Sequence, residues 1–201
     1  MARPLALGFV LLSFVATAIP ARAQNFIENS SETINKGNFK LAAFPTGLFG
    51  KNGGPDRWGG AVRAGYGFTD NFDVEAKSAF FNGFTLVGAD AEVWLLKGDV
   101  DLAVSAGGHK ALVSAGRDST AFDLAAQLSR HVAHRLEVYG GTSVSFEHLD
   151  GVRDSGFTRA YVIPGVEYKI SDDLDFVSEF GVGLNKNSPH YFGLGFALYI
   201  R

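Results

Sequence analysis

Strict alternation between uncharged and polar side chains recurs in ten segments of this chain and constrains its fold more than any other feature. Between residues 72 and 80, Asp73, Glu75 and Lys77 share one parity, and the other parity carries no charge. Successive side chains of a β-strand point to opposite faces. Ten such segments joined by turns therefore predict a sheet with one apolar face and one ionic face.

The lengths of the connections give a second, independent pattern. Strands are expected near residues 38–44, 58–68, 72–81, 85–95, 100–109, 121–130, 135–147, 158–170, 174–183 and 191–200. Tight turns follow the second, fourth, sixth and eighth of these, and longer stretches follow most of the others; the short connection at 82–84 is an exception. Short turns at one rim and longer loops at the other are typical of membrane barrels. The sequence predicts an all-β, closed antiparallel transmembrane β-barrel of about ten strands, with eight or twelve as alternatives.

Alternation alone does not say which face is inside. A secreted lipocalin-like lipid carrier would turn the apolar face inward. Many small residues lie on the ionic face, among them Gly65, Gly107 and Gly181, and these suit a lumen where a few charged side chains share limited space. Glycines would only weaken a solvent-facing sheet. The membrane barrel is therefore favoured over the carrier.

The amino terminus has the features of an export signal. Arg3 precedes an apolar run over 5–19, and Ala21-Arg22-Ala23 supplies a cleavage site. The expected domains are a signal peptide over 1–23, a flexible lead-in over 24–37 and a barrel over 38–201, located in the cell outer membrane. The chain has no cysteine, a net negative charge and no basic cluster, which argues against nucleic acid as a partner.

The ionic face gives the residues expected to line the lumen. They are Arg63, Asp73, Glu75, Lys77, Asp90, Glu92, Asp101, Asp123, Glu137, Arg159, Glu167, Lys169, Asp175 and Glu179. Four of the acids, Asp73, Asp101, Glu137 and Asp175, each follow a tight turn and should lie at one height. Eight-stranded barrels are filled by their own side chains, and diameter grows with strand number. A network of salt bridges that plugs the lumen is therefore favoured over a narrow cation-preferring pore.

Aromatic residues collect near both ends of the apolar face. The predicted girdle comprises Phe68, Phe72, Tyr168 and Phe176 at the turn rim, and Trp58, Phe80, Phe146, Phe180 and Phe192 at the loop rim. Pro45 and Pro164 fit this pattern poorly, because a closed barrel has no edge where a missing N–H is harmless. Each is interpreted as a bulge or a strand end.

The last strand carries Phe192, Leu194, Phe196, Leu198 and Ile200 at alternate positions. With the export signal and the ten segments, this run resembles the small outer-membrane β-barrel proteins of Gram-negative bacteria. The resemblance implies that the run is an assembly signal read by the barrel-assembly machinery, and that the partners are this machinery and outer-membrane lipid. The family usually ends in an aromatic residue, whereas this chain ends in Ile200 and Arg201.

Fold and location do not fix function. The sequence favours a structural envelope barrel or a narrow pore, with an outer-membrane enzyme or a loop-mediated adhesion protein as alternatives. His109, His148 and His190 are placed near the loop rim, beside Glu147 and Ser188, and form no recognised catalytic motif. No catalytic residue or cofactor is therefore predicted. His131 and His134 have metal-ligand spacing without a third ligand in view, so no metal site is predicted either.

Overall fold

The computed structural model describes residues 31–201, and the predicted signal peptide lies outside them. Ten strands make up the fold. They are β1 (Phe39–Phe49), β2 (Arg57–Thr69), β3 (Phe72–Phe81), β4 (Phe84–Leu96), β5 (Asp101–Val113), β6 (Ser119–Ala133), β7 (Leu136–Leu149), β8 (Phe157–Lys169), β9 (Leu174–Gly183) and β10 (His190–Ile200). No helix long and apolar enough to cross a membrane occurs among these described residues.

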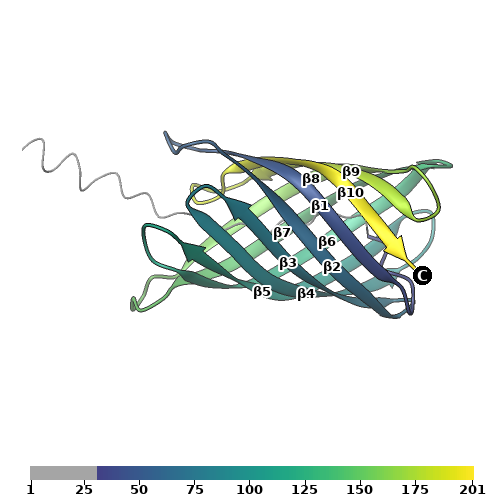
Figure 1. Cartoon of the computed structure of the whole chain (residues 1–201), viewed down its shortest axis with the longest axis horizontal. Helices are drawn as coiled ribbons and strands as arrows, with labels where there is room; N and C mark the ends of the chain where they lie inside the picture. The colour runs from purple at the N-terminus through teal and green to yellow at the C-terminus, as the bar shows by residue number, and fades with distance from the viewer. Residues whose placement is uncertain (1–30) are drawn as a thin grey trace, which may run out of the picture.

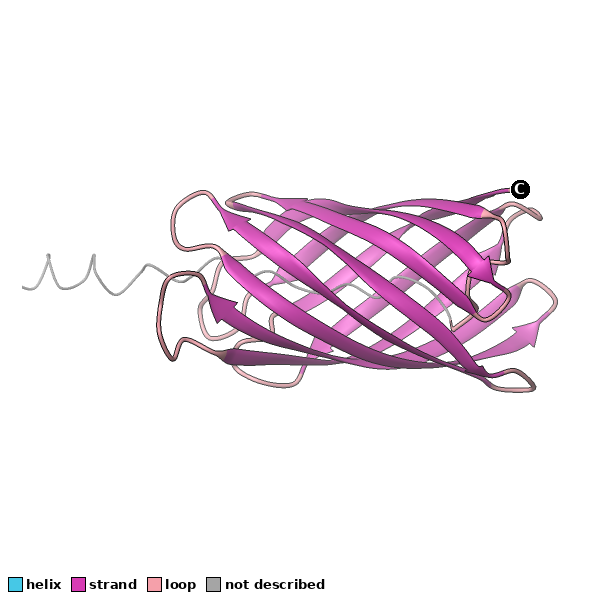
Figure 2. Ribbon diagram, turned by 90° about the horizontal axis from the view of Figure 1, so that it is seen from below, coloured by secondary structure: helices cyan, strands magenta, loops and turns pink. Residues whose placement is uncertain are grey.

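Each strand pairs antiparallel with its neighbours in sequence, and β10 closes the barrel against β1 (Figures 1 and 2). The closing pair runs from Phe39 opposite Ile200 to Phe49 opposite His190. Closure leaves no unpaired strand edge. The predicted class, a closed antiparallel barrel of ten strands, is confirmed. We call the end with the short connections after β2, β4, β6 and β8 the turn end, and the opposite end the loop end.

Burial alternates along the strands as the sequence pattern predicts. In β3, Asp73, Glu75 and Lys77 are buried inside, whereas Phe80 on the other face is 53% exposed. The outer surface carries a belt of exposed apolar side chains that includes Leu124 and Phe196. The charged face therefore points inward, which is the arrangement of a membrane barrel and the reverse of a lipid carrier.

Three predicted strands were too short and missed four residues or more, whereas the ends of the other strands differ by two residues or fewer. β1 continues past Pro45 to Phe49, β5 reaches Val113, and β6 begins at Ser119. The register shifts lie next to the short turns after β2, β4 and β6, with the first between Gly67 and Thr69. The hairpin between β3 and β4 is as short as expected, and Gly83 occupies its positive-φ position at +96°.

The interpretation of the two prolines as bulges or strand ends was wrong. Pro45 lies in the middle of β1 opposite Gly60, and Pro164 lies within β8 opposite Gly140, both in unbroken register. On the other side of each proline, toward β10 and β9 respectively, two consecutive residue pairs are missing from the ladder, which then resumes in the same register. A missing N–H thus interrupts one ladder locally without shifting the strand.

The described part of the lead-in, residues 31–37, packs inside the turn end of the barrel, where the sequence suggested a flexible segment. Ile34 is buried, and its backbone N–H donates to Asp73 Oδ2 over 2.7 Å. The hydroxyl of Ser31 bonds to the Ser129 hydroxyl, and Lys36 forms a β-bridge with Gly67. These residues therefore occupy lumen volume that would otherwise be open at this end.

Candidate functional site

The lumen is the candidate functional site, and the structure places the predicted lining residues as follows. Buried inside the barrel are Arg63, Asp73, Glu75, Lys77, Asp90, Glu92, Asp101, Asp123, Glu137, Arg159, Glu167, Asp175 and Glu179. Lys169 is exposed and lines a small cavity at the turn end. Lys40, at the start of β1, joins the buried set.

Charged side chains in the middle of the lumen are linked in one continuous series. Its first part joins β1, β3 and β2: Lys40 Nζ donates to Glu75 Oε1 over 2.7 Å, and Arg63 Nε donates to Glu75 Oε2 over 2.6 Å. One carboxylate thus accepts hydrogen bonds from two cations. Charge-assisted bonds of this length are the strong class of hydrogen bond.

The series continues across β4, β6 and β5. Asp90 accepts from Arg63 Nη2 over 3.4 Å and from Lys77 Nζ over 2.7 Å. Lys77 also reaches Asp123 Oδ2 over 2.9 Å, and His109 Nδ1 lies 2.7 Å from the same oxygen. The links therefore bridge six consecutive strands of the barrel.

Two smaller groups extend the polar interior toward β7–β10. Glu147 pairs with Arg159 Nε over 2.9 Å and accepts a hydrogen bond from Ser119. Glu179 accepts from the hydroxyls of Tyr139 and Tyr191, over 3.1 and 2.5 Å. These contacts fill the side of the lumen that the charged series does not reach.

An apolar and aromatic layer near the loop end was not predicted from the sequence. Phe81 and Phe84 stack inside with ring centroids 5.1 Å apart, and Tyr161 meets Tyr191 edge to face. Leu48, Leu86 and Ile163 are buried with them. The sequence did contain one indication of this layer: Phe80 and Phe81 are adjacent, so one of the two phenylalanines must face the lumen. The layer separates the charged series from the loops.

Little space remains among the charged side chains. A cavity of about 10 Å³ lies between Arg63, Asp73, Glu75, Asp90, Glu92, Ser105 and Gln127. This is about the volume occupied by one water molecule. The middle of the lumen is therefore a packed polar core.

At the turn end, two of the four acids that follow tight turns accept hydrogen bonds from backbone N–H groups. Asp73 holds the lead-in through Ile34, and Asp101 accepts from the N–H of Gly98 over 3.0 Å. A cavity of about 20 Å³ lies beside Glu137, lined also by Glu32, His131, His134, Arg135, Glu167 and Lys169. Burial raises the pKa of Glu32 above its usual value. Three carboxylates therefore surround this small cavity at the turn end of the barrel.

The residues considered for catalysis do not converge. His109 lies four residues inside the end of β5, buried against Asp123, so its predicted place at the loop rim was wrong. Ser188 donates to Asn185, and His190 stacks on Phe180. His148 contacts Ser155 in the loop after β7. Among these described residues, no serine hydroxyl contacts a histidine that is also paired with a carboxylate.

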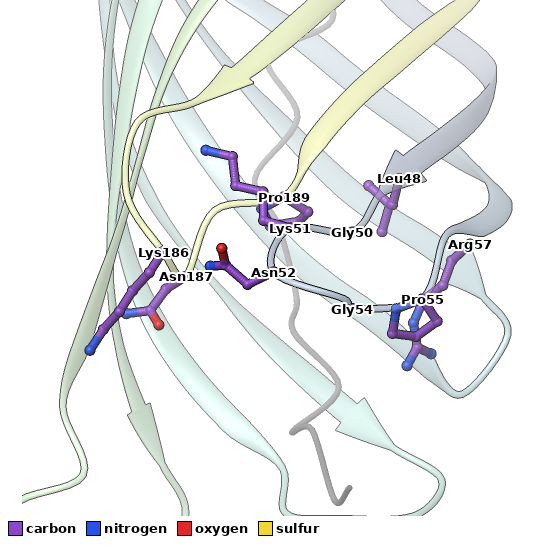
Figure 3. Close-up of a pocket in the computed structure, with 10 residues that line it drawn as sticks. All are labelled: Leu48, Gly50, Lys51, Asn52, Gly54, Pro55, Arg57, Lys186, Asn187 and Pro189. Atoms are coloured by element: carbon purple, nitrogen blue, oxygen red, sulfur yellow. The ribbon is translucent and has the colours of Figure 1, made fainter.

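The loop end carries one large surface pocket, about 370 Å³, between the connections that follow β1 and β9 (Figure 3). Lys51, Arg57 and Lys186 contribute to its lining, but their charged ends point in different directions. Lys51 donates to the carbonyl of Gly183, and Arg57 donates to that of Asn82. Elsewhere at the loop end, a hydrogen bond from Lys110 lowers the pKa of Asp150.

The predicted girdle residues all point outward. Trp58, Phe68, Phe80, Phe146, Tyr168 and Phe180 are exposed, and Phe72, Phe176 and Phe192 are partly so. On β10, Leu194, Phe196, Leu198 and Ile200 are exposed on the same outer face. The aromatic residues thus lie where the two interfaces of a bilayer would meet the barrel.

No protein-family model matches the sequence, and no curated protein is significantly similar to it. Solved structures do match. An outer-membrane channel from Pseudomonas putida F1 aligns with a TM-score of 0.50 and 10% identity, over 88% of this chain and 100% of that one. The outer-membrane protein OprG from Pseudomonas aeruginosa gives 0.42 and 12%, over 86% and 100%.

The N-terminal β-barrel domain of Pseudomonas aeruginosa OprF matches with a TM-score of 0.39 and 16% identity, over 82% of this chain and 98% of that domain. At such identities the likeness concerns the fold alone. The resemblance to Gram-negative outer-membrane barrels inferred from the sequence is confirmed at that level: this chain has the fold of a transmembrane outer-membrane β-barrel.

Proposed function

We propose that this protein is an envelope barrel of the outer membrane whose lumen is closed by its own side chains. The apolar outer belt and the outward aromatic residues at both rims support this location, because they favour lipid around the barrel. Its partners would be outer-membrane lipid and, during biogenesis, the barrel-assembly machinery reading β10. No enzymatic activity is proposed.

One observation gives the main support for a closed lumen. The series from Lys40 to His109 crosses the interior with every link at 3.4 Å or less. A permeating ion would have to separate these pairs, and removing one partner of a buried pair costs about 3–5 kcal/mol. The aromatic layer above and the lead-in below add two further barriers.

Single-channel recording in a planar bilayer tests the proposal. The refolded protein should show no steps above background in 1 M KCl, while a known porin inserted under the same conditions conducts. Heat-modifiable gel mobility would verify that the recorded sample contains folded barrel. Regular conductance steps from the wild-type protein would contradict a closed lumen.

A narrow cation-preferring pore is the second candidate. Acids outnumber bases among the buried lumen residues, and the matched Pseudomonas putida protein is described as a channel. A ring of carboxylates favours cations. If the protein conducts, replacing Asp73, Asp101, Glu137 and Asp175 together with Asn or Gln should reduce cation preference, measured as a reversal potential. If the lumen is closed, the same variant should lose stability and stay silent.

A further inference from the structure

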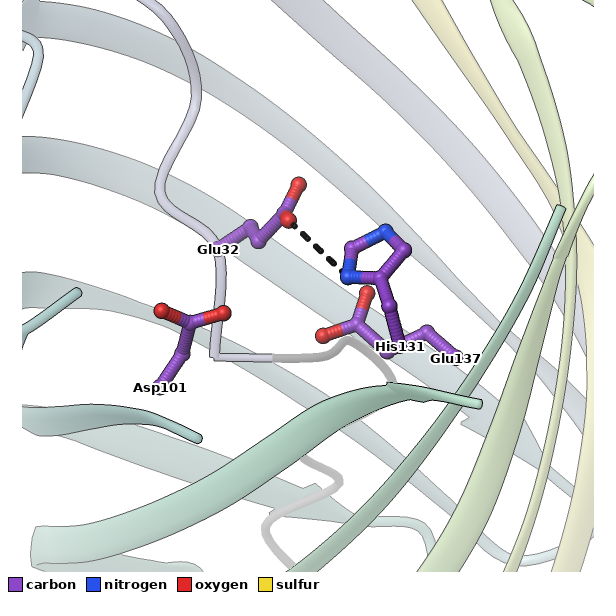
Figure 4. Close-up of side chains that lie close together, drawn as sticks. All are labelled: Glu32, Asp101, His131 and Glu137. Atoms are coloured by element: carbon purple, nitrogen blue, oxygen red, sulfur yellow. Dashed lines mark ion pairs between the residues drawn. The ribbon is translucent and has the colours of Figure 1, made fainter. Parts of the chain in front are cut away.

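Four potential metal ligands meet inside the turn end of the barrel. Glu32, Asp101, His131 and Glu137 each offer one donor atom, and these atoms all lie within 4.8 Å of one another (Figure 4). They come from four separate segments: the lead-in, β5, β6 and β7. The set combines an imidazole with three carboxylates, so it is more than a group of acids.

The backbone register fixes three of these ligands. His131 lies directly opposite Glu137 in the β6–β7 pair. Asp101 lies opposite Ser129, which precedes His131 by two residues and therefore shares its face. The three side chains thus project from consecutive strands toward one point, independently of any loop.

The fourth ligand is positioned by its neighbour in the lead-in. The Ser31 hydroxyl bonds to the Ser129 hydroxyl and donates to the Asp101 carbonyl over 3.3 Å. This places Glu32 directly over the strands, with Oε1 at 3.8 Å from His131 Nδ1. Ligands around a zinc ion, at bond lengths of about 2.1 Å, lie roughly 3.4 Å apart. Small side-chain rotations would therefore bring the four donors to coordination distance.

The charges around this cluster differ from those elsewhere in the lumen. Glu75, Asp90, Asp123 and Glu147 each have a lysine or arginine within 3.4 Å. Within the described part of the chain, neither Glu32 nor Asp101 forms an ion pair with a lysine or arginine. Arg135 and Lys169 line the adjoining cavity of about 20 Å³ without an ion pair to either carboxylate. This cavity has room for an ion or a water, and the half-exposed His131 provides an entry path from the turn end.

We propose that Glu32, Asp101, His131 and Glu137 bind one divalent transition-metal ion, of the kind for which imidazole and carboxylate are suitable ligands, such as Zn²⁺ or Mn²⁺. The bound ion would tie the lead-in to three strands of the barrel wall. Lumen closure at the turn end would then depend on metal. This inference goes beyond the proposed function, because a closed envelope barrel does not need a metal.

Calorimetric titration with ZnCl₂ tests the site. The full barrel, refolded in detergent and stripped with EDTA, should bind one Zn²⁺ per chain. His131→Ala and Glu137→Gln should each weaken binding at least tenfold. His134→Ala is the matched control, because His134 lines the same cavity outside the ligand set, and its affinity should stay within twofold of wild type. No saturable binding, or equal affinity in wild type and His131→Ala, would overturn the proposal.

A measurement on the unmodified sequence covers the case in which a variant does not fold. Diethyl pyrocarbonate modifies accessible histidines, and peptide mass spectrometry reports each one separately. Zn²⁺ should protect His131 and leave the modification of His148, at the opposite end, unchanged. Equal modification of His131 with and without Zn²⁺ would show that its imidazole is not a ligand.

Discussion

Arg63 and Lys77 are directly opposite each other in the β2–β3 pair, although both are cations. Like charges in this position destabilise a sheet. Here Asp90 accepts from both, over 3.4 Å from Arg63 and 2.7 Å from Lys77. Glu75 and Asp123 each take one further bond from the pair. The two cations are therefore balanced by three carboxylates of the same charged series.

The first prediction removes the shared acid of this pair. Asp90→Asn leaves Arg63 and Lys77 buried and opposed with less negative charge between them, so the free energy of unfolding should fall by about 3–5 kcal/mol. Urea unfolding in detergent measures this change. Asp99→Asn, in the exposed turn between β4 and β5, is the control and should have little effect. Equal stability of both variants would mean that Asp90 does not balance the two cations.

The inward face could be read from the sequence because side-chain direction in a strand has a period of two residues. Asp73, Glu75 and Lys77 share a parity, and all three are inside. Strand ends were less predictable. Pro45 suggested an end, yet β1 continues, because only the ladder toward β10 lacks a proton donor there. The intact ladder to β2 keeps β1 extended, although Pro45 has no N–H to donate.

Partners within the lumen could not be read from the sequence. Lys77 and Asp123 are 46 positions apart, and only the closed register of β3–β6 brings them together. The polar lead-in looked unstructured, because its partners Asp73 and Ser129 lie far along the chain. The set of Glu32, Asp101, His131 and Glu137 is equally long-range, so His131 and His134 alone gave no third ligand.

A second prediction tests the orientation of the apolar face. Leu124 points outward near the middle of β6, between Ala106 and Val144 of the adjacent strands. Arginine at a lipid-facing position near the bilayer midplane costs about 2–4 kcal/mol. Leu124→Arg should therefore lower the yield and stability of barrel refolded into lipid vesicles, and Leu124→Ala should be much milder. Equal refolding of the two variants would contradict a lipid-facing Leu124.

A third prediction concerns a glycine that accommodates a tyrosine. A Cβ at Gly181 would lie 1.8 Å from the ring of Tyr191, whose hydroxyl donates to Glu179. Gly181→Ala should displace the ring, break this bond and cost about 1–3 kcal/mol, as overpacking does. Gly140→Ala is the control, because a Cβ there meets nothing within 4 Å. Thermal unfolding of the two variants should differ clearly; matching midpoints would place Tyr191 elsewhere.

The last prediction concerns the lead-in, residues 31–37, which fills the lumen at the turn end. A Cβ at Gly67 would lie 2.3 Å from the carbonyl oxygens of Ile34 and Asn35. Gly67 belongs to β2, which the barrel holds on both sides, so the lead-in is the part that must move. Gly67→Ala should therefore weaken the contact between Ile34 and Asp73 and expose Ile34, which is buried in the wild-type protein.

A single-cysteine reporter measures this displacement, since the chain contains no cysteine of its own. Ile34→Cys should react slowly with a polar maleimide in the otherwise unchanged barrel, and several times faster when combined with Gly67→Ala. Gly60→Ala, on the opposite face of the same strand, is the matched control and should leave the rate unchanged. If all three proteins react equally fast, Ile34 is not seated in the lumen, and the lead-in does not contribute to the proposed closure of the turn end.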